Sequence, residues 1–347
     1  MNPHPLVTIL VPNYNYGRYL STCLSSAVGQ TYDNLEVIFV DNHSSDDSYD
    51  IAMEFQSKFK DRIRIFRSDE NYGASRNSLK ANYMMSPRSE CHIYLSSDDY
   101  FEPTLVERSV KIMQDHPSVG FVINHRKAID ENDVITYEPP FYNCSCVVPS
   151  TEQMEVFMMA GIGVSTQCLR KQSVEREGEP VRGYCFDVAG DWFSNFCLAS
   201  ASDLGYIMDP LCTYRTHSGN ETNHAIRNLT NSIEHVLLIH AFAEMAQSLG
   251  RPSVARRLGP AKEKLGTMCL RYCTQLLHEG DAYTARRYLH LAPVLRPDIV
   301  DEPSWRTLSR LSQLPPEDCL PGLMEFEATC PQKRMVSYAP PPGAIRL

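Results

Sequence analysis

Short apolar segments alternate with longer segments of helical periodicity over the first hundred residues. The apolar segments are rich in β-branched or aromatic side chains and cover residues 6–11, 35–40, 63–66 and 93–95. Between them, apolar side chains recur every three or four positions, which is typical of amphipathic helices. Strands that alternate with helices form βαβ units and a mostly parallel sheet. This part of the chain is therefore predicted to be α/β.

The same patterns predict the elements that follow. A helix is expected after Pro103, a strand over 119–123, a loop over about 130–150, helices over 152–160 and 187–201, and a strand, turn and strand over 204–214. From about Asn231 the pattern changes to long helical repeats over 233–249, 254–278 and 282–291. We therefore expect an α/β domain over residues 1–228 and an all-helical accessory region over residues 229–347, which ends in a loosely ordered Pro-rich tail.

Composition narrows the class of protein. The chain has 347 residues and 43% hydrophobic residues, enough for a large core. Its formal net charge of -9 argues against nucleic acid as a main partner, because nucleic-acid-binding domains carry a basic face. It has 12 cysteines without a Cys-x-x-Cys pair, no signal-peptide pattern and no apolar run of transmembrane length. These features predict a cytoplasmic protein with reduced cysteines, and they leave open contact with the inner face of the membrane.

Acidic residues follow two of the predicted strands. Asp41 ends the second, and Asp98 and Asp99 follow the fourth. Ligands of open α/β sheets bind outside the carboxyl ends of the strands. Two adjacent carboxylates repel each other unless a cation lies between them, and oxygen ligands suit Mg²⁺ or Mn²⁺. Each Asp could instead cap a helix. Neither a Gly-x-Gly-x-x-Gly nor a P-loop pattern is present, which disfavours dinucleotide and P-loop enzymes.

An ordered set of motifs resembles the family 2 glycosyltransferases. The motifs are Val7-Thr8-Ile9-Leu10-Val11-Pro12-Asn13-Tyr14-Asn15, Gln30-Thr31-Tyr32, Val40-Asp41-Asn42, Asn71-Tyr72-Gly73, Arg76-Asn77, Leu95 to Asp99, Gly190-Asp191-Trp192 and Tyr214-Arg215-x-His217. The resemblance covers residues 5 to about 224 and does not explain the helical region. It implies a GT-A fold, a nucleotide-sugar donor, a divalent metal and transfer of the sugar with inversion.

The resemblance also implies roles for individual residues. The nucleotide-binding residues would be Pro12, Asn13, Tyr14, Asn15, Asp41, Asn42, Asn71, Gly73, Arg76, Ser97 and Asp98. The Mg²⁺ or Mn²⁺ ligands would be Asp98, Asp99 and His217, and the contacts to acceptor or diphosphate would be Trp192 and Arg215. Asp191 would be the catalytic base.

Three positions depart from the family pattern. Many members have a second Asp where this chain has Asn42, an acidic residue where it has Gly190, and the first Asp of the metal motif where it has Ser96. Because the amide oxygen of Asn42 can still accept a hydrogen bond from a pyrimidine, the donor could carry uridine or thymidine. Asp98 and Asp99 must then suffice for the metal.

Asp191 also has two interpretations from its own sequence context. Transfer to a hydroxyl needs a base within reach of the acceptor proton, and an Asp that opens an amphipathic helix can point into a cleft. It could equally be a helix cap followed by a core Trp192.

The sequence thus predicts a hexosyl- or related sugar transferase that uses a UDP- or dTDP-sugar and a glycan or lipid-linked acceptor. A sugar nucleotidyltransferase is one alternative. The other is a catalytically degenerate nucleotide-sugar binding module whose helical tail binds a partner. Self-association through the helical tail is a further expectation.

Overall fold

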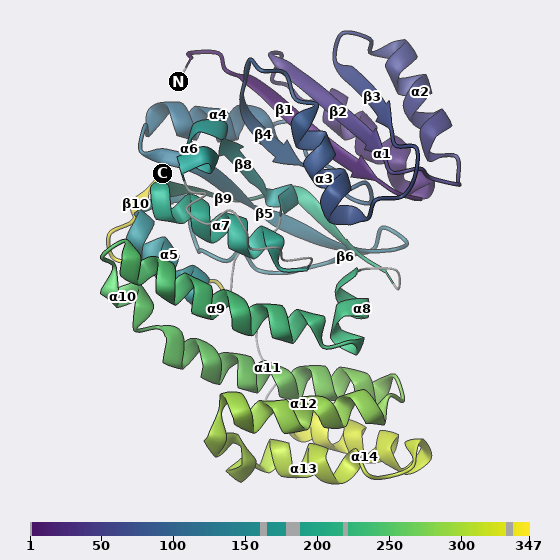
Figure 1. Ribbon diagram of the computed structural model, residues 1–347, viewed down its shortest axis with the longest axis vertical. Helices are drawn as coiled ribbons and strands as arrows, with labels where there is room; N and C mark the ends of the chain where they lie inside the picture. The colour runs from purple at the N-terminus through teal and green to yellow at the C-terminus, as the bar shows by residue number, and fades with distance from the viewer. Residues whose placement is uncertain (1, 160–164, 178–187, 218–220, 331–335) are drawn as a thin grey trace.

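The computed structural model describes residues 2–159, 165–177, 188–217, 221–330 and 336–347. Within these residues one sheet of ten strands is flanked by helices, and a second group of helices extends away from it (Figure 1). The path of the sheet is β10-β7-β9-β5-β8-β4-β1-β2-β3, and β6 pairs with β5. The predicted α/β class with a helical extension is confirmed.

The first four strands and their helices agree with the predicted elements. The strands are β1 (Leu6–Asn13), β2 (Leu35–Asp41), β3 (Ile63–Arg67) and β4 (Ser89–Tyr94), and the helices between them are α1 (Gly17–Val28), α2 (Ser48–Lys58) and α3 (Ala74–Tyr83). All neighbouring pairs in this part are parallel. Asn13 lies beside Asp41 at the carboxyl ends of β1 and β2, so these ends form one edge of the sheet.

Beyond β4 the sheet is mixed rather than mostly parallel. The next elements are α4 (Leu105–Asp115), β5 (Val119–Asp130), β6 (Ile135–Thr136), β7 (Cys146–Val148), α5 (Ser150–Met158), the 3-10 turn η1 (Ser165–Gln167), β8 (Cys168–Lys171), α6 (Gln172–Glu177), α7 (Gly190–Ala201) and β9 (Asp203–Thr216). β8 lies antiparallel between β4 and β5. The loop expected over 130–150 contains the short strands β6 and β7, whose length of two or three residues is too small to show an alternating pattern.

The predicted strand, turn and strand over 204–214 is wrong, because β9 is one strand with a bulge. Ile207 pairs with Asn124, whereas Pro210 pairs with the next residue of β5, His125. Proline cannot donate to the ladder and is tolerated at a bulge, so the Asp209-Pro210 pair interrupts the register without ending the strand. The continuous strand carries Arg215 to the end of the sheet.

Side chains that alternate along the strands build two separate layers of core. On one face, Ile9, Phe39 and Ile93 pack with residues of α1 and α4. On the other face, Leu10 and Ile38 pack with α3, while Phe121 and Tyr206 pack with α5 and α7. Burial of the sheet on both faces accounts for the nearly continuous apolar runs of β1 and β2.

The helical region begins after β9 and packs against the sheet domain through α9. It contains α8 (Glu221–Arg227), α9 (Thr230–Ser248), α10 (Pro252–Ala255), α11 (Leu258–His278), α12 (Ala282–Leu295), the 3-10 helix η2 (Pro297–Asp301), α13 (Pro303–Leu311) and α14 (Pro316–Thr329). The helices α11 to α14 share an apolar cluster, which also includes Ile226 of α8 and Ile239 of α9. Phe242 of α9, however, stacks on Phe196 of α7 with ring centroids 3.9 Å apart, so α9 shares a core with the sheet domain.

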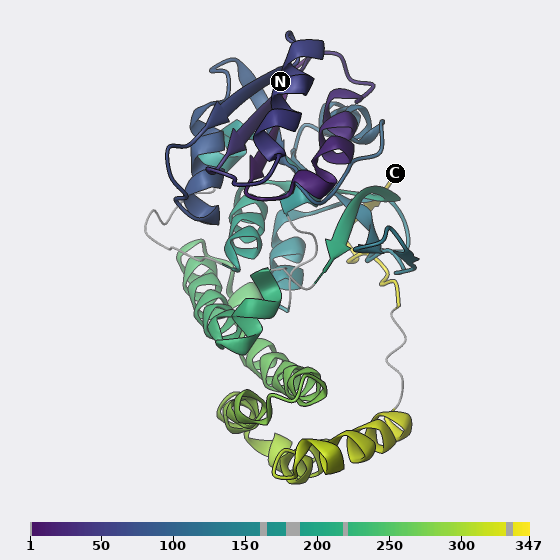
Figure 2. The same ribbon diagram turned by 90° about the vertical axis from the view of Figure 1, so that its right-hand side faces the viewer.

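The last residues of the chain return to the sheet (Figure 2). β10 (Ile345–Arg346) pairs antiparallel with β7, and the Leu347 N–H donates to the Ser145 carbonyl at 3.0 Å. The Tyr338 N–H donates to the Phe141 carbonyl at 2.7 Å. The loosely ordered tail expected from its proline content is therefore wrong for residues 336–347, because strand pairing with a distant partner orders them.

Candidate active site

A cavity of about 570 Å³ opens at the carboxyl ends of β1 and β2. Its described lining comprises Pro12, Asn13, Tyr14, Asn15, Tyr16, Asn42, Asn71, Gly73, Ala74, Asn77, Ser78 and His217. This lining has five asparagines and, among the described residues, no Asp, Glu, Lys or Arg. Amides supply both donors and acceptors, so the cavity suits an uncharged polar heterocycle such as a nucleobase.

Asn42 joins the end of β2 to the segment that precedes α3. Its Nδ2 donates to the Asn71 Oδ1 at 2.7 Å and to the Gly73 carbonyl at 3.3 Å, and its Oδ1 accepts from the Tyr72 N–H at 3.0 Å. Gly73 has a φ of 83°, a conformation that glycine adopts without steric cost. The amide of Asn42 therefore fixes one wall of the cavity.

Asn13 and Asn77 each leave one acceptor unused. The Asn77 Nδ2 donates to the carbonyls of Asn13 and Val40, at 3.3 and 3.2 Å. The Oδ1 atoms of Asn13 and Asn77 are buried and have no hydrogen-bond partner in the described part of the chain. Because buried polar atoms are nearly always paired, two unused acceptors at one cavity point to N–H or O–H groups of a ligand.

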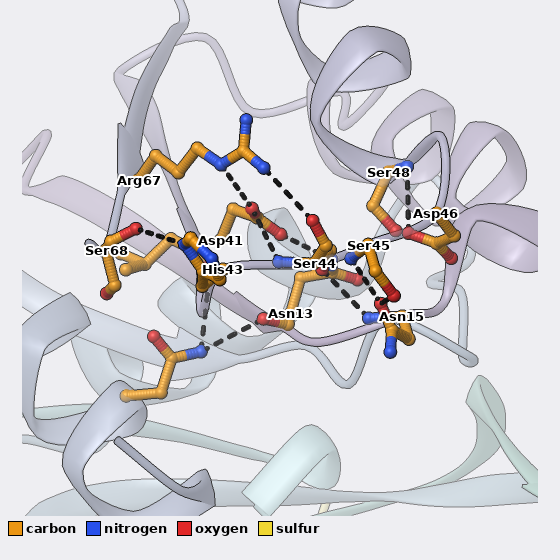
Figure 3. Close-up of polar contacts among 12 residues, drawn as sticks. Asn13, Asn15, Asp41, His43, Ser44, Ser45, Asp46, Ser48, Arg67 and Ser68 are labelled. Carbon is orange, nitrogen blue, oxygen red and sulfur yellow. Dashed lines mark hydrogen bonds and ion pairs between the residues drawn. The ribbon is translucent and has the colours of Figure 1, made fainter. Parts of the chain in front are cut away.

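The loop after β2 is held to the end of β1 by a network of short side chains (Figure 3). Asp41 is fully buried; its carboxylate accepts from the Asn13 Nδ2 and the Ser44 N–H, both at 3.1 Å, and pairs with the Arg67 Nε at 3.3 Å. The Asn15 Oδ1 accepts from the Ser45 N–H at 2.8 Å. Asp41 thus lies behind the described cavity lining, where it orients Asn13.

Asp98 and His217 meet at the edge of the cavity. The His217 Nε2 lies 3.1 Å from the Asp98 Oδ2, and the two side chains are 10% and 12% exposed. The rings of Tyr16 and Tyr19 flank the imidazole, with centroids 5.7 and 6.0 Å from its own. β9 brings these groups together from positions 119 residues apart.

This pair has the donor atoms that a divalent cation needs. No group of three or more His, Cys, Asp or Glu side chains gathers as a metal cluster among the described residues. A Mg²⁺ or Mn²⁺ ion bound by Asp98 and His217 would complete its shell with water or the oxygens of a diphosphate, as such ions commonly do. The residues therefore fit a metal that binds together with a phosphorylated ligand.

Asp99 has a different environment from Asp98. It is 4% exposed, and its Oδ1 accepts from the Arg215 N–H at 2.8 Å and from the Thr213 Oγ1 at 3.4 Å. Burial, together with the neighbouring Asp98, raises the pKa of Asp99 well above its usual range. Asp99 thus joins the turn after β4 to β9, which leaves Asp98 as the carboxylate beside the cavity.

Arg215 uses its guanidinium within the protein. Its Nε donates to the Asp98 carbonyl at 2.8 Å, and its terminal nitrogens donate to the Asp130 carbonyl at 2.8 Å and the Asp133 Oδ1 at 2.7 Å. The guanidinium also lies 4.4 Å from the centroid of the Tyr19 ring. Because these donors are directed at the chain itself, Arg215 holds the backbone of Asp98 in place.

Replacement of Arg215 by Met is expected to lower the free energy of unfolding by roughly 2 kcal/mol or more, because it removes donors from two carbonyls in the interior. Denaturant unfolding measures this loss. Arg108→Met is the matched control: Arg108 pairs with Asp209, both partly exposed, so its loss should cost less than about 1 kcal/mol. Equal effects of the two substitutions would contradict the role given to Arg215.

Asp191 occupies the first turn of α7, and its Oδ1 accepts from the Trp192 N–H at 2.7 Å. Burial raises the pKa of Asp191 to about 6, although the Trp192 N–H and the guanidinium of Arg170 act to lower it. Arg126 lowers the pKa of both Asp191 and Asp99, so one cation influences both carboxyl groups. A carboxylate with a pKa near neutrality is well suited to accept a proton.

Trp192 lies in the packing between helices rather than in the described cavity lining. Its indole Nε1 donates to the Phe157 carbonyl at 2.8 Å, and its ring meets His235 and Phe242 of α9. Among the other predicted contacts, Arg76 is exposed on α3, and the Ser97 Oγ donates to the Pro12 carbonyl at 3.0 Å. Ser97 therefore supports the cavity indirectly, because it holds the backbone of Pro12 near the end of β1.

Four residues that line the cavity are not among the site residues predicted from the sequence: Tyr16, Ala74, Asn77 and Ser78. Asn77 could have been found, because it lies one helical turn after Gly73 in the quoted motif Arg76-Asn77.

In the described part of the chain, no helix combines the length and apolar character needed to cross a bilayer.

Comparisons with known proteins agree with this geometry. The sequence model for "Glycosyl transferase family 2" matches residues 8–166. An uncharacterized glycosyltransferase of Nostoc sp. is 26% identical over 62% of this chain, and the putative glycosyltransferase EpsH of Bacillus subtilis is 28% identical over 61%. The matches cover 66% and 61% of the length of these two relatives. Glycosyltransferase GlyG of Streptococcus pneumoniae is 27% identical over 62% of this chain and 72% of its own.

Two solved structures have the same fold. S. aureus TarS in complex with UDP-GlcNAc superposes with a TM-score of 0.54 over 88% of this chain and 90% of its own, at 14% identity. The mannosyltransferase PcManGT from Pyrobaculum calidifontis, in complex with GDP-Man and Mn²⁺, superposes with a TM-score of 0.52 over 93% of this chain and 87% of its own, at 15% identity.

The order of the strands and the two superposed structures show a fold of the GT-A type. Residues 8–166 match the family 2 glycosyltransferases, and the relatives of similar sequence are named as glycosyltransferases.

Proposed function

We propose that the protein is an inverting glycosyltransferase that moves a hexosyl or related sugar from a UDP- or dTDP-sugar to a hydroxyl of a glycan or lipid-linked acceptor. The observation that carries the proposal is the Asp98–His217 pair beside an uncharged, asparagine-rich cavity. The complexes of TarS with UDP-GlcNAc and of PcManGT with GDP-Man and Mn²⁺ support a nucleotide-sugar donor and a divalent metal.

Each part of the site has a distinct role in this reaction. The asparagines of the cavity hold the nucleoside, and Asp98 with His217 would hold a Mg²⁺ or Mn²⁺ ion. A bound Mg²⁺ or Mn²⁺ supplies positive charge that stabilises the departing diphosphate. Asp191 takes the proton from the acceptor hydroxyl, whose oxygen bonds to the anomeric carbon as the bond from that carbon to the diphosphate oxygen breaks.

The two rival functions give different products. A sugar nucleotidyltransferase would release pyrophosphate from a nucleoside triphosphate and a sugar phosphate. A degenerate module would bind nucleotide sugars without turnover. Two assays with Mn²⁺ separate the three: nucleoside diphosphate release from a panel of nucleotide sugars with and without sugar acceptors, and pyrophosphate release from nucleoside triphosphates with sugar phosphates. Binding of nucleotide sugars without release in either assay would favour the module.

The nucleotide assignment has its own test in the unused Oδ1 atoms of Asn13 and Asn77. UDP and dTDP should bind at least about tenfold more tightly than GDP in calorimetry. Asn77→Ala should weaken UDP binding at least about five- to tenfold, because it removes the acceptor for the base and the two donors that hold the carbonyls of Asn13 and Val40. Leu79→Ala, on an exposed side of the same helix, is the control. Preference for GDP would overturn the pyrimidine assignment and leave the fold and family unchanged.

A further inference from the structure

A carboxylate of α9 holds the start of the helix that carries Asp191. Glu234 is 8% exposed, and its Oε2 accepts from the N–H groups of Val188 and Ala189 at 2.9 and 3.0 Å. Val188 and Ala189 immediately precede α7. The first N–H groups of a helix have no partner within it, and a negative charge at that end is favourable. Glu234 therefore anchors the two residues that lead into α7, from 45 residues further along the chain.

Aromatic packing on the same two helices strengthens this connection. His235, next to Glu234, meets the Trp192 ring edge-on with centroids 5.1 Å apart. Phe242, two turns further along α9, meets Trp192 at 5.7 Å and stacks on Phe196 at 3.9 Å. Residues of α9 thus contact the chain both before Asp191, at Val188 and Ala189, and after it, at Trp192.

Gly190 adds no side-chain contact of its own to this support. It stands between the anchored residues and Asp191, and a Cβ placed there would meet no atom within 4 Å. Glycine restricts its own backbone less than any other residue, and here no side chain of its own packs against the neighbours. The direction of the Asp191 carboxylate therefore depends on the contacts to Val188 and Ala189 before it and Trp192 after it.

We propose that Glu234 is a positioning residue for catalysis, which orients Asp191 by holding the two N–H groups before α7. The proposal rests on the proposed function, since it takes Asp191 as the base. It makes α9 part of the reaction centre rather than of a separable accessory region. Glu234 touches no reacting atom in this role, because its carboxylate oxygen is engaged by the backbone.

The test compares Glu234→Ala with Glu234→Gln in the full-length chain. Small displacements of a catalytic group can lower rates by up to about a hundredfold, so Glu234→Ala should lower kcat about 10- to 100-fold. The Kd for UDP should stay within about threefold of the wild-type value, because the substitution leaves the residues of the nucleotide cavity unchanged. The amide oxygen of Gln can accept both N–H groups, so Glu234→Gln should recover most of the turnover.

A double substitution shows whether Glu234 acts through Asp191. In the Asp191→Asn background, Glu234→Ala should lower kcat little further, because residues that act as one unit are not additive. Glu244→Ala, an exposed carboxylate on the same helix, should leave kcat unchanged. If Glu234→Ala does not fold, Glu234→Asp replaces it: Asp keeps the charge, but its shorter side chain cannot reach both N–H groups, so its kcat should fall as well.

The outcomes separate this inference from the function on which it rests. Loss of turnover in Asp191→Asn, with normal kcat in folded Glu234→Ala, would overturn the role of Glu234 alone. Fully additive losses in the double variant would also overturn it. Normal turnover in Asp191→Asn would instead remove the proposed base.

Discussion

Asp191→Asn is expected to lower turnover by about 10²- to 10⁴-fold, the usual contribution of a general base. Asparagine keeps the size of the side chain and can accept the Trp192 N–H, but it cannot take a proton at neutral pH. Calorimetry with UDP and Mn²⁺ should give near-normal binding, because Asp191 is not among the residues that line the described part of the cavity. Near-normal turnover would mean that Asp191 serves only as a local cap.

The pH dependence provides a second check on Asp191. A base must be deprotonated, so kcat/KM in the wild type should fall as the pH decreases through about 6, the pKa that burial gives this carboxyl in the free protein. A pH profile of kcat/KM measures this limb. A limb centred near the ordinary carboxyl value of about 4 would contradict a buried base.

Stability should respond in the opposite direction. The folded pKa of Asp191, about 6, lies above the ordinary value of 3.8, so the folded protein binds more protons between these pH values. The contribution of this group to the free energy of unfolding therefore falls as the pH rises through that window, and the penalty persists above it. Asp191→Asn removes this penalty, so its melting temperature at neutral pH should equal or exceed that of the wild type.

Asp98→Ala is expected to abolish the effect of metal on nucleotide binding and to lower turnover by at least about 100-fold. A divalent ion at a leaving diphosphate is worth several kcal/mol, and each 1.4 kcal/mol is about a factor of ten in rate. UDP binding with Mn²⁺ and with EDTA, in the wild type and the variant, measures the first effect. Asp209→Asn, a partly exposed carboxylate on β9, is the control.

Asp99 offers a sharper comparison with Asp98. Asn at position 99 can still accept from the Arg215 N–H, so Asp99→Asn should retain metal-dependent binding of UDP. Asp98→Asn replaces the carboxylate that faces His217 with a weaker metal ligand, so this variant should lose metal-dependent binding of UDP. The reverse result would make Asp99, rather than Asp98, the main metal ligand. UDP affinity that is the same with Mn²⁺ and EDTA in the wild type would remove the metal assignment altogether.

The elements that could be predicted are those whose signals are local. The apolar runs of β1 and β2 and the turn residues after them define a strand followed by a ligand-binding loop. The residues Pro12 to Asn15, Asn42, Asn71 and Gly73 do line one cavity. A regular strand places its carboxyl end at a known edge of the sheet, so a short motif was enough to locate these residues.

The length and pairing of the later elements could not be predicted in the same way. β9 passes through Asp209-Pro210 because its partner β5 continues on the other side of the bulge. β10 is ordered by β7, from almost 200 residues earlier in the sequence. Propensity and periodicity describe a segment alone, whereas these strands depend on hydrogen bonds to a distant partner.

The sequence by itself determined the fold class, the family resemblance and the set of polar residues at the sheet edge. Only the tertiary structure decided the environment of the individual residues: Asp98 lies beside the cavity while Asp99 is buried, Arg215 binds the backbone and Trp192 packs on α9. It also showed Glu234, which the sequence did not indicate, anchoring the residues before α7. Adjacent residues in an irregular turn have no fixed periodicity, so their directions depend on the groups packed around them. Those groups belong to β9 and α9, which are separated by many residues along the chain from the residues that they contact.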